Sequence, residues 1–187
     1  MSDDATLLAA YARKGDVSAL SALITRHAAW LMALLRGLSP TAADVEDAFQ
    51  ETWVRVMKSA ASFRGGSVRA YLARVARSVV IDRFRRVHMQ EVSLDAEGDD
   101  GQALGEVMAD EGPTPVEVFE SKATREDVRA AVQSLPEGPR EVLLMRVEGE
   151  LAFHEIAAVL GVPLGTVLTR MRTATVQLKK KLGNGND

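Results

Sequence analysis

The fold of this chain is decided by residues 135–182, which read LPEGPREVLLMRVEGELAFHEIAAVLGVPLGTVLTRMRTATVQLKKKL. Within this stretch, residues 153–160 have the apolar spacing of a short helix, residues 161–163 (Gly-Val-Pro) form a turn, and residues 164–182 form a longer helix. Two helices joined by a short turn that contains glycine are typical of a helix-turn-helix motif. Because this motif places its second helix in the major groove, the stretch predicts a domain that binds duplex DNA.

The second helix of this motif has two chemically different sides. One side is apolar and is expected to face the core, with Leu164, Val167, Leu168, Met171, Leu178 and Leu182. The other side is basic and rich in hydroxyl groups, which suits contacts to phosphates and base edges. Its candidate DNA-binding residues are Thr166, Thr169, Arg170, Arg172, Thr173 and Lys180. An ordinary solvated helix face would look similar, but the small Ala157 at the expected helix crossing and Gly161 at the turn favour the motif.

The composition excludes several classes of protein. The chain has 187 residues, of which 47% are hydrophobic and 5% aromatic, so it can bury one or two small aliphatic cores. It has no cysteine, which excludes disulfides and thiolate metal sites. No apolar run approaches the roughly 18 residues of a membrane span, and the acidic start MSDDATLL lacks the parts of a secretory leader. We therefore expect a cytoplasmic protein without membrane insertion.

Charge divides the chain into three parts. Residues 88–127 carry 12 acidic and 2 basic side chains, a net charge of −10, whereas the remainder carries 21 basic and 14 acidic side chains, a net charge of +7. The acidic part has few large apolar residues and cannot bury enough surface to offset the entropy of ordering. We therefore predict a flexible acidic linker at residues 88–125, between one domain at 1–87 and another at 126–187.

The first domain is predicted to be a bundle of about four helices. Apolar residues recur with helical spacing in 20–35, in 45–57 and in 68–79, and a short helix is expected at 4–13. No strand-like alternation is present, so the predicted fold class is all-α, with two small helical domains.

The last helix of this bundle is rich in arginine. Residues 64–86 contain seven arginines and one acidic residue, Asp82, with Tyr71 and Phe84 among them. This combination suits single-stranded nucleic acid, because bases stack on aromatic side chains while arginines neutralise the backbone. A solvated arginine face is the simpler reading of this helix alone. Two basic regions joined by a linker favour one shared nucleic-acid ligand.

The helix before it is acidic, with Asp44, Glu46, Asp47 and Glu51 within eight residues. No histidine, phosphate-binding loop or nucleophile accompanies these carboxylates, so they indicate a surface for a basic protein partner rather than a metal or catalytic site. We therefore predict no catalytic residue, no metal ligand and no cofactor. The three histidines, His27, His88 and His154, are expected to have structural or surface roles.

In these motifs the chain resembles the extracytoplasmic-function (ECF) sigma factors, small promoter-recognition subunits of bacterial RNA polymerase. Residues 44–56 (DVEDAFQETWVRV) are similar to the family's acidic helix, and FRG at 63–65 and RVARSVVIDRFRR at 74–86 follow in the family's order. The segments LPEGPREVLLMR and GVPLGTVLTRM resemble the family's C-terminal signatures. The resemblance implies a sigma region 2 domain followed by a region 4 domain.

The resemblance also implies a role for each group of residues. Core RNA polymerase would bind the acidic helix, at Asp44, Glu46, Asp47, Gln50 and Glu51. The −10 promoter element would be held as a single strand by Arg64, Arg69, Tyr71, Arg74, Arg77, Ser78, Arg83, Arg85 and Arg86. The helix at 164–182 would read the −35 element through the six polar residues given above. An anti-sigma factor or another regulator is the further partner that the family implies, and the polymerase would supply the catalysis.

The chain departs from the family at several positions. Leu168, Thr173 and Thr175 stand where basic residues are usual, which predicts low intrinsic affinity for duplex DNA. Ala152 replaces the usual hydroxyl-bearing N-cap and should cost about 1 kcal/mol of helix-end stability. The alternative function is a stand-alone helix-turn-helix regulator that binds operators as a dimer, although no dimerisation seam is recognisable. In the free protein, the split of charge suggests that the two domains pack together.

Overall fold

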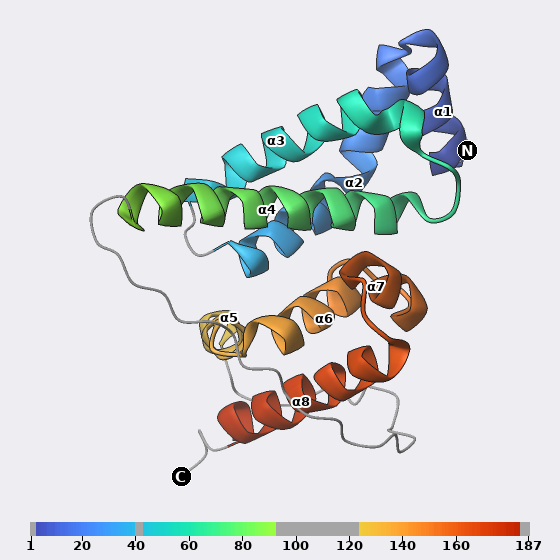
Figure 1. The fold of residues 1–187 in the computed structure, drawn as a ribbon. Helices are drawn as coiled ribbons and strands as arrows, with labels where there is room; N and C mark the ends of the chain where they lie inside the picture. The colour runs from blue at the N-terminus through green and yellow to red at the C-terminus, as the bar shows by residue number, and fades with distance from the viewer. Residues whose placement is uncertain (1–2, 40–42, 93–123, 184–187) are drawn as a thin grey trace.

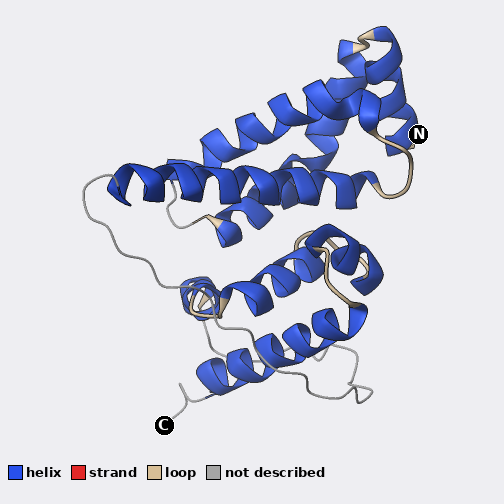
Figure 2. Cartoon of the chain, viewed as in Figure 1, coloured by secondary structure: helices blue, strands red, loops and turns tan. Residues whose placement is uncertain are grey.

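The computed structural model describes residues 3–39, 43–92 and 124–183, and these residues form helices and no strand (Figure 2). The all-α prediction is therefore confirmed. The N-terminal domain contains α1 (Asp4–Lys14), α2 (Val17–Leu38), α3 (Ala43–Ser59), the 3-10 turn η1 (Ala60–Ser62) and α4 (Val68–Val92). The C-terminal domain contains α5 (Arg125–Gln133), α6 (Glu137–Val147), α7 (Phe153–Leu160) and α8 (Leu164–Gly183).

Helix α2 is the central helix of the N-terminal domain. Its first turn is capped by Asp16, whose carboxylate accepts a hydrogen bond from the Ala19 N–H at 3.1 Å. Its leucines are buried, and Leu31 and Leu34 are completely so. The helix is long and apolar enough to satisfy the length and composition test for a membrane span. In this structure, however, its apolar side chains belong to the hydrophobic core.

Helix α4 continues farther than the charge pattern predicts. The predicted linker begins at residue 88, but the helix runs without interruption to Val92. Residues 88–92 contain neither glycine nor proline, so nothing in the local sequence ends the helix where the acidic composition begins. The rest of the predicted linker, up to residue 123, lies outside the described residues.

The predicted helix-turn-helix is confirmed in α7 and α8. Helix α7 ends at Gly161, which has the left-handed φ of 68° and donates its N–H to the Ala157 carbonyl at 2.9 Å. Ile156 of α7 and Val167 of α8 are fully buried between the helices of this domain. One part of the prediction is wrong: Leu164 and Leu168 do not face the core, because each is 46% exposed.

The two domains pack against each other as two layers, with α1–α4 in one and α5–α8 in the other (Figure 1). A single hydrophobic core runs through both layers. At the contact, a side-chain carbon built on Gly37 of α2 would lie 2.5 Å from both methyl carbons of Leu144 of α6, so a larger residue at this position would force Leu144 to move. The expected packing of the domains in the free protein is therefore present in this structure.

Candidate nucleic-acid interface

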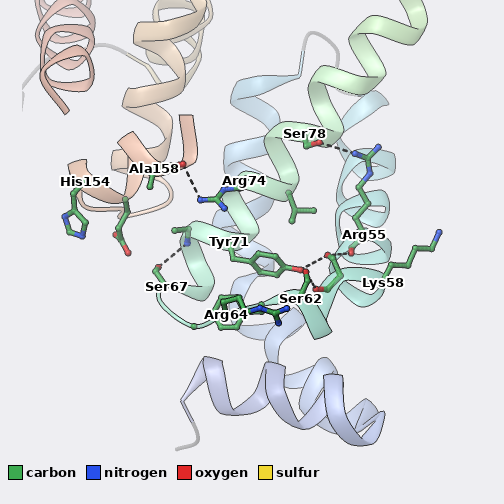
Figure 3. Close-up of a pocket in the computed structure, with 16 residues that line it drawn as sticks. Arg55, Lys58, Ser62, Arg64, Ser67, Tyr71, Arg74, Ser78, His154 and Ala158 are labelled. Carbon is green, nitrogen blue, oxygen red and sulfur yellow. Dashed lines mark hydrogen bonds between the residues drawn. The ribbon is translucent and has the colours of Figure 1, made fainter. Parts of the chain in front are cut away.

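An open pocket of about 870 Å³ lies between α3, the loop at residues 63–67, α4 and α7 (Figure 3). Four cationic side chains of the N-terminal domain line it: Arg55, Lys58, Arg64 and Arg74. The opposite wall comes from α7, with His154, Glu155 and Ala158. The pocket therefore combines positive charge with a boundary that belongs to the other domain.

Two aromatic rings and a hydroxyl pair also line this pocket. The centroids of the Phe63 and Tyr71 rings are 5.3 Å apart, at an angle of 55° between the planes. The Ser59 hydroxyl donates to the Arg55 carbonyl at 2.6 Å and lies 2.7 Å from the Tyr71 hydroxyl. Since the serine proton is already used, the tyrosine donates to the serine oxygen. Tyr71 is thereby held with its ring beside Phe63.

Apart from Arg85, the predicted −10 residues fall into three groups in the structure. Arg64, Tyr71, Arg74 and Ser78 come together around the pocket. Arg69 and Arg77 lie instead at the domain contact, and Arg83 and Arg86 bind the acidic helix. Arg85 is exposed on α4. Sequence reasoning missed Arg55 and Lys58, which lie about one and two helical turns beyond the acidic cluster of α3. Those positions were the available signal.

Arginines of α4 make most of the polar contacts between the domains. Arg77 binds the carboxylate of Glu141 with two hydrogen bonds, at 2.6 and 3.3 Å, and Glu141 is only 5% exposed. Arg69 pairs with Glu150, and its guanidinium lies over the ring of Trp30 at 5.3 Å. Arg74 donates to the Ala158 carbonyl at 3.3 Å. These three candidate −10 residues are therefore engaged by the C-terminal domain.

The residue that pairs with Arg69 has an unusual backbone. Glu150 adopts a φ of 50°, in the left-handed region that few side chains other than glycine and asparagine favour. It follows Gly149, whose carbonyl accepts a second hydrogen bond from Arg69 at 3.2 Å. The strained turn between α6 and α7 thus presents both a carboxylate and a carbonyl to one arginine.

The acidic helix α3 is paired with the end of α4. Arg83 lies 3.2 Å from Asp47, 3.5 Å from Asp44 and 3.8 Å from Glu51. Although burial opposes it, hydrogen bonding by Arg55 and Arg86 holds the pKa of Glu51 below its usual value. Glu51 therefore stays ionised and fixes α3 against α4, which is a structural role that the sequence did not indicate.

A different part of α3 remains open to a partner. Glu46, Asp47 and Gln50 are exposed, and Asp47 keeps 67% of its side chain accessible despite its arginine. Val54 and Met57, 40% and 36% exposed, continue the same helix face toward η1. This face is acidic at one end and apolar in the middle, and its apolar part was missed because Met57 was assigned to the core stripe.

The six predicted −35 residues of α8 also separate by exposure. Thr169, Arg172 and Lys180 are exposed, whereas Thr166, Arg170 and Thr173 are half-buried. The Thr173 hydroxyl donates to the Thr169 carbonyl at 3.0 Å. Arg170 crosses to α6, where a side-chain carbon on Gly138 would lie 2.9 Å from its Nε atom. The face that α8 offers to solvent is consequently less basic than its sequence suggests.

Comparison with known families identifies both halves of this molecule. Residues 23–88 match the model for sigma-70 region 2, and residues 125–178 match the model for sigma-70 region 4. The ECF RNA polymerase sigma factor SigE of Mycolicibacterium smegmatis is 32% identical over 185 residues, covering 97% of this chain and 69% of that protein. This chain belongs to the ECF sigma factors. It functions as a promoter-recognition subunit of RNA polymerase.

Other relatives agree with this ECF assignment. The ECF RNA polymerase sigma-E factor of Escherichia coli K12 is 29% identical over 177 residues, covering 91% of this chain and 90% of that protein. Among solved structures, CnrH in complex with the cytosolic domain of CnrY matches with a TM-score of 0.68 at 24% identity, covering 99% of this chain and all of that one. RpoE of Bartonella quintana, solved with the anti-sigma factor NepR, matches with a TM-score of 0.64 at 21% identity, covering 82% of this chain and 89% of that one. At these identities, the two structures support the fold alone.

Proposed function

We propose that this ECF sigma factor holds the −10 element as a single strand in the pocket between α3 and α4 while it is bound to core RNA polymerase. The observation that carries the proposal is the Phe63–Tyr71 pair, with Arg64 and Arg74 lining the same pocket. Arg55 also lines the pocket but is paired with Glu51 and Asp82. Stacking of a base on an aromatic side chain contributes about 1–3 kcal/mol, and the arginines neutralise the backbone. The pocket therefore favours an unstacked base over a base inside the duplex.

The docking surface for the polymerase is assigned to the exposed face of α3. Asp44 and Glu51 are half-buried and paired with arginines of α4. Glu46, Asp47 and Gln50 are exposed and accessible to a partner, Asp47 despite its pairing with Arg83. Val54 and Met57 supply apolar area beside them. An interface with an apolar centre and a charged rim is the usual arrangement in stable complexes.

The C-terminal domain is assigned to the −35 duplex, with Thr169 and Arg172 of α8 in the major groove. Core polymerase performs the chemistry of initiation, and the complex acts in the cytoplasm. An anti-sigma factor is the expected regulator, since the two solved structures compared above are complexes with a second protein. No observation favours a stand-alone regulator.

Run-off transcription with purified core polymerase tests the docking surface. We expect Glu46→Lys with Asp47→Lys to abolish polymerase binding, because two cations replace the charges that attract a basic partner. Glu126→Lys is a matched control, since Glu126 also lies in the first turn of a helix and is exposed, but on the other domain. Wild-type polymerase affinity in the double variant would contradict the assignment of α3, and absence of initiation by the unmodified protein would contradict the function.

The closed arrangement must open before promoter DNA binds. Arg69, Arg74 and Arg77 are bound to Glu150, the Ala158 carbonyl and Glu141, so the −10 strand and the C-terminal domain compete for the same guanidinium groups. Polymerase, which engages both domains, would supply the free energy for this exchange. The closed form is thus a state with low affinity for promoter DNA.

A further inference from the structure

The exposed face of α8 contains an apolar pair that the core does not use. Leu164 and Leu168 are each 46% exposed, although Val167 and Met171 between and beyond them are buried. The two leucines are one helical turn apart, so they lie one above the other on the surface. An exposed leucine carries little information by itself, but this pair lies on the recognition helix.

Leu168 is placed among the side chains that a recognition helix presents to base edges. The N-terminal half of such a helix makes the base contacts, and in that half Leu164, Leu168, Thr169 and Arg172 are exposed. Arg170 is not part of this group, because its guanidinium packs beside Gly138 of α6. The base-facing surface therefore consists of an apolar patch, one hydroxyl group and one guanidinium group.

The chemistry of the major groove determines what a leucine can recognise there. Adenine, guanine and cytosine present hydrogen-bond donors and acceptors, whereas thymine also presents its apolar C5-methyl group. Leucine offers neither donor nor acceptor, so it would desolvate polar base edges without replacing their hydrogen bonds. Against a thymine methyl group, both partners instead bury apolar surface.

We propose that Leu168 reads a thymine of the −35 element through its C5-methyl group, with Leu164 covering the outer side of the same contact. This inference rests on the proposed assignment of α8 to the −35 duplex, and it names a specificity-determining residue for that site. Burial of one methyl group stabilises a complex enough to change affinity about fourfold. The expected effect is thus modest, confined to one base pair and dependent on one side chain.

Removal of single methyl groups from the DNA tests the proposal. Holoenzyme reconstituted from the full chain and core RNA polymerase first selects −35 elements from a promoter library randomised at those positions. Each thymine of the selected element, on either strand, is then replaced by deoxyuridine, which lacks only the methyl group. With the unmodified chain, we expect about fourfold weaker promoter binding at one of these positions.

The same measurement on Leu168→Ala decides whether this side chain is responsible. The variant should bind the thymine promoter about fourfold more weakly and should no longer distinguish thymine from deoxyuridine. Val176→Ala is the matched control, because Val176 is 58% exposed on α8 about two turns farther from the base-reading end. It should keep the full sensitivity to the methyl group.

Two results would overturn the inference: methyl sensitivity that persists in Leu168→Ala, or a selected element in which no thymine is sensitive. A holoenzyme that initiates transcription but selects no −35 sequence would instead show that α8 does not read this element. The inference would then fail together with the assignment on which it rests. This case is recognised at the selection step, before any thymine is replaced.

Discussion

Among single residues, His27 of α2 is the most unusual, because it is a polar side chain that is only 2% exposed. Trp30 donates its indole N–H to Nδ1 at 2.9 Å, and Nε2 lies 3.0 Å from the Asp4 carboxylate. This pattern assigns the neutral tautomer with the proton on Nε2. Protonation of Nδ1 would remove the acceptor that Trp30 uses and would add a third cation beside Arg69 and Arg26.

The stability of the protein is expected to depend on pH through His27. Burial, together with Arg69 and Arg26, lowers the pKa of His27 below its usual value of 6.5, although Asp4 opposes the shift. The unfolded chain therefore binds more protons between the two pKa values, and stability rises with pH across that window. The contribution is fully present above about pH 6.5 and is lost as pH falls through the lowered pKa.

We expect the free energy of unfolding, measured with urea, to decrease as the pH is lowered from about 7 to about 5. His27→Gln should make this slope shallower, because the titrating group is gone. His154 is exposed, so His154→Gln should keep the original slope. Equal slopes in the two variants would show that His27 does not contribute.

At the scale of elements, helix α7 begins with an incomplete cap. The Ala152 N–H donates to the Glu155 carboxylate at 2.7 Å, which is one half of a capping box, but alanine cannot accept the reciprocal hydrogen bond. We expect Ala152→Ser to complete the box and to raise the free energy of unfolding by about 0.5–1 kcal/mol. Ala158→Ser, inside the same helix, should not stabilise the protein. A urea midpoint unchanged by Ala152→Ser would mean that the cap has no energetic role.

Helical periodicity predicted where the helices lie and placed Val167 and Met171 correctly in the core, but it drew the buried face of α8 too wide. The helical spacing of apolar residues predicts a buried face only if every apolar side chain points inward. On that assumption, Leu164 and Leu168 belong to the core. A helix that contacts DNA can also carry apolar side chains on its outer face, where a base methyl group is the partner. The acidic composition likewise placed the start of the linker too early, at residue 88, because composition does not record where helical hydrogen bonding ends.

At the scale of the whole molecule, the contact between the domains could be anticipated but not located. The charge split suggested that the domains attract each other, but it could not show that Arg77 meets Glu141, 64 positions away. Nor could it show that Arg69 and Arg77 contact the C-terminal domain rather than line the pocket between α3 and α4. Long-range pairs depend on how two folded surfaces fit together, and local sequence patterns do not contain that information.

The pair Arg77–Glu141 provides a prediction about domain closure. Glu141→Lys would place two cations together at a buried position, so we expect the domains to separate and the radius of gyration from X-ray scattering to increase. The exchange Arg77→Glu with Glu141→Arg restores opposite charges and should return the radius toward its original value. An equally compact Glu141→Lys variant would show that this ion pair does not hold the domains together.

The steric contact at Gly37 provides an independent way to open the molecule. Alanine is favoured over glycine by about 0.8–1 kcal/mol in a helix interior. Gly37 is the last residue but one of α2, so Gly37→Ala would stabilise this helix by less than that if the N-terminal domain stood alone. In the closed molecule, however, the new carbon would lie 2.5 Å from the methyl carbons of Leu144. We therefore expect Gly37→Ala to shift the chain toward the open form, with a larger radius of gyration.

Opening should have a functional consequence, because Arg69, Arg74 and Arg77 would lose their partners in the C-terminal domain. We expect Gly37→Ala to bind a single-stranded −10 oligonucleotide more tightly than the unmodified chain, with affinity measured by fluorescence anisotropy. Truncation of the opposing side chain should relieve the clash, so Gly37→Ala combined with Leu144→Ala should recover compactness relative to Gly37→Ala alone. If Gly37→Ala increases the radius of gyration without improving binding of the oligonucleotide, the domain contact does not compete with DNA. Closure of the two domains would then stabilise their packing without lowering the affinity for DNA.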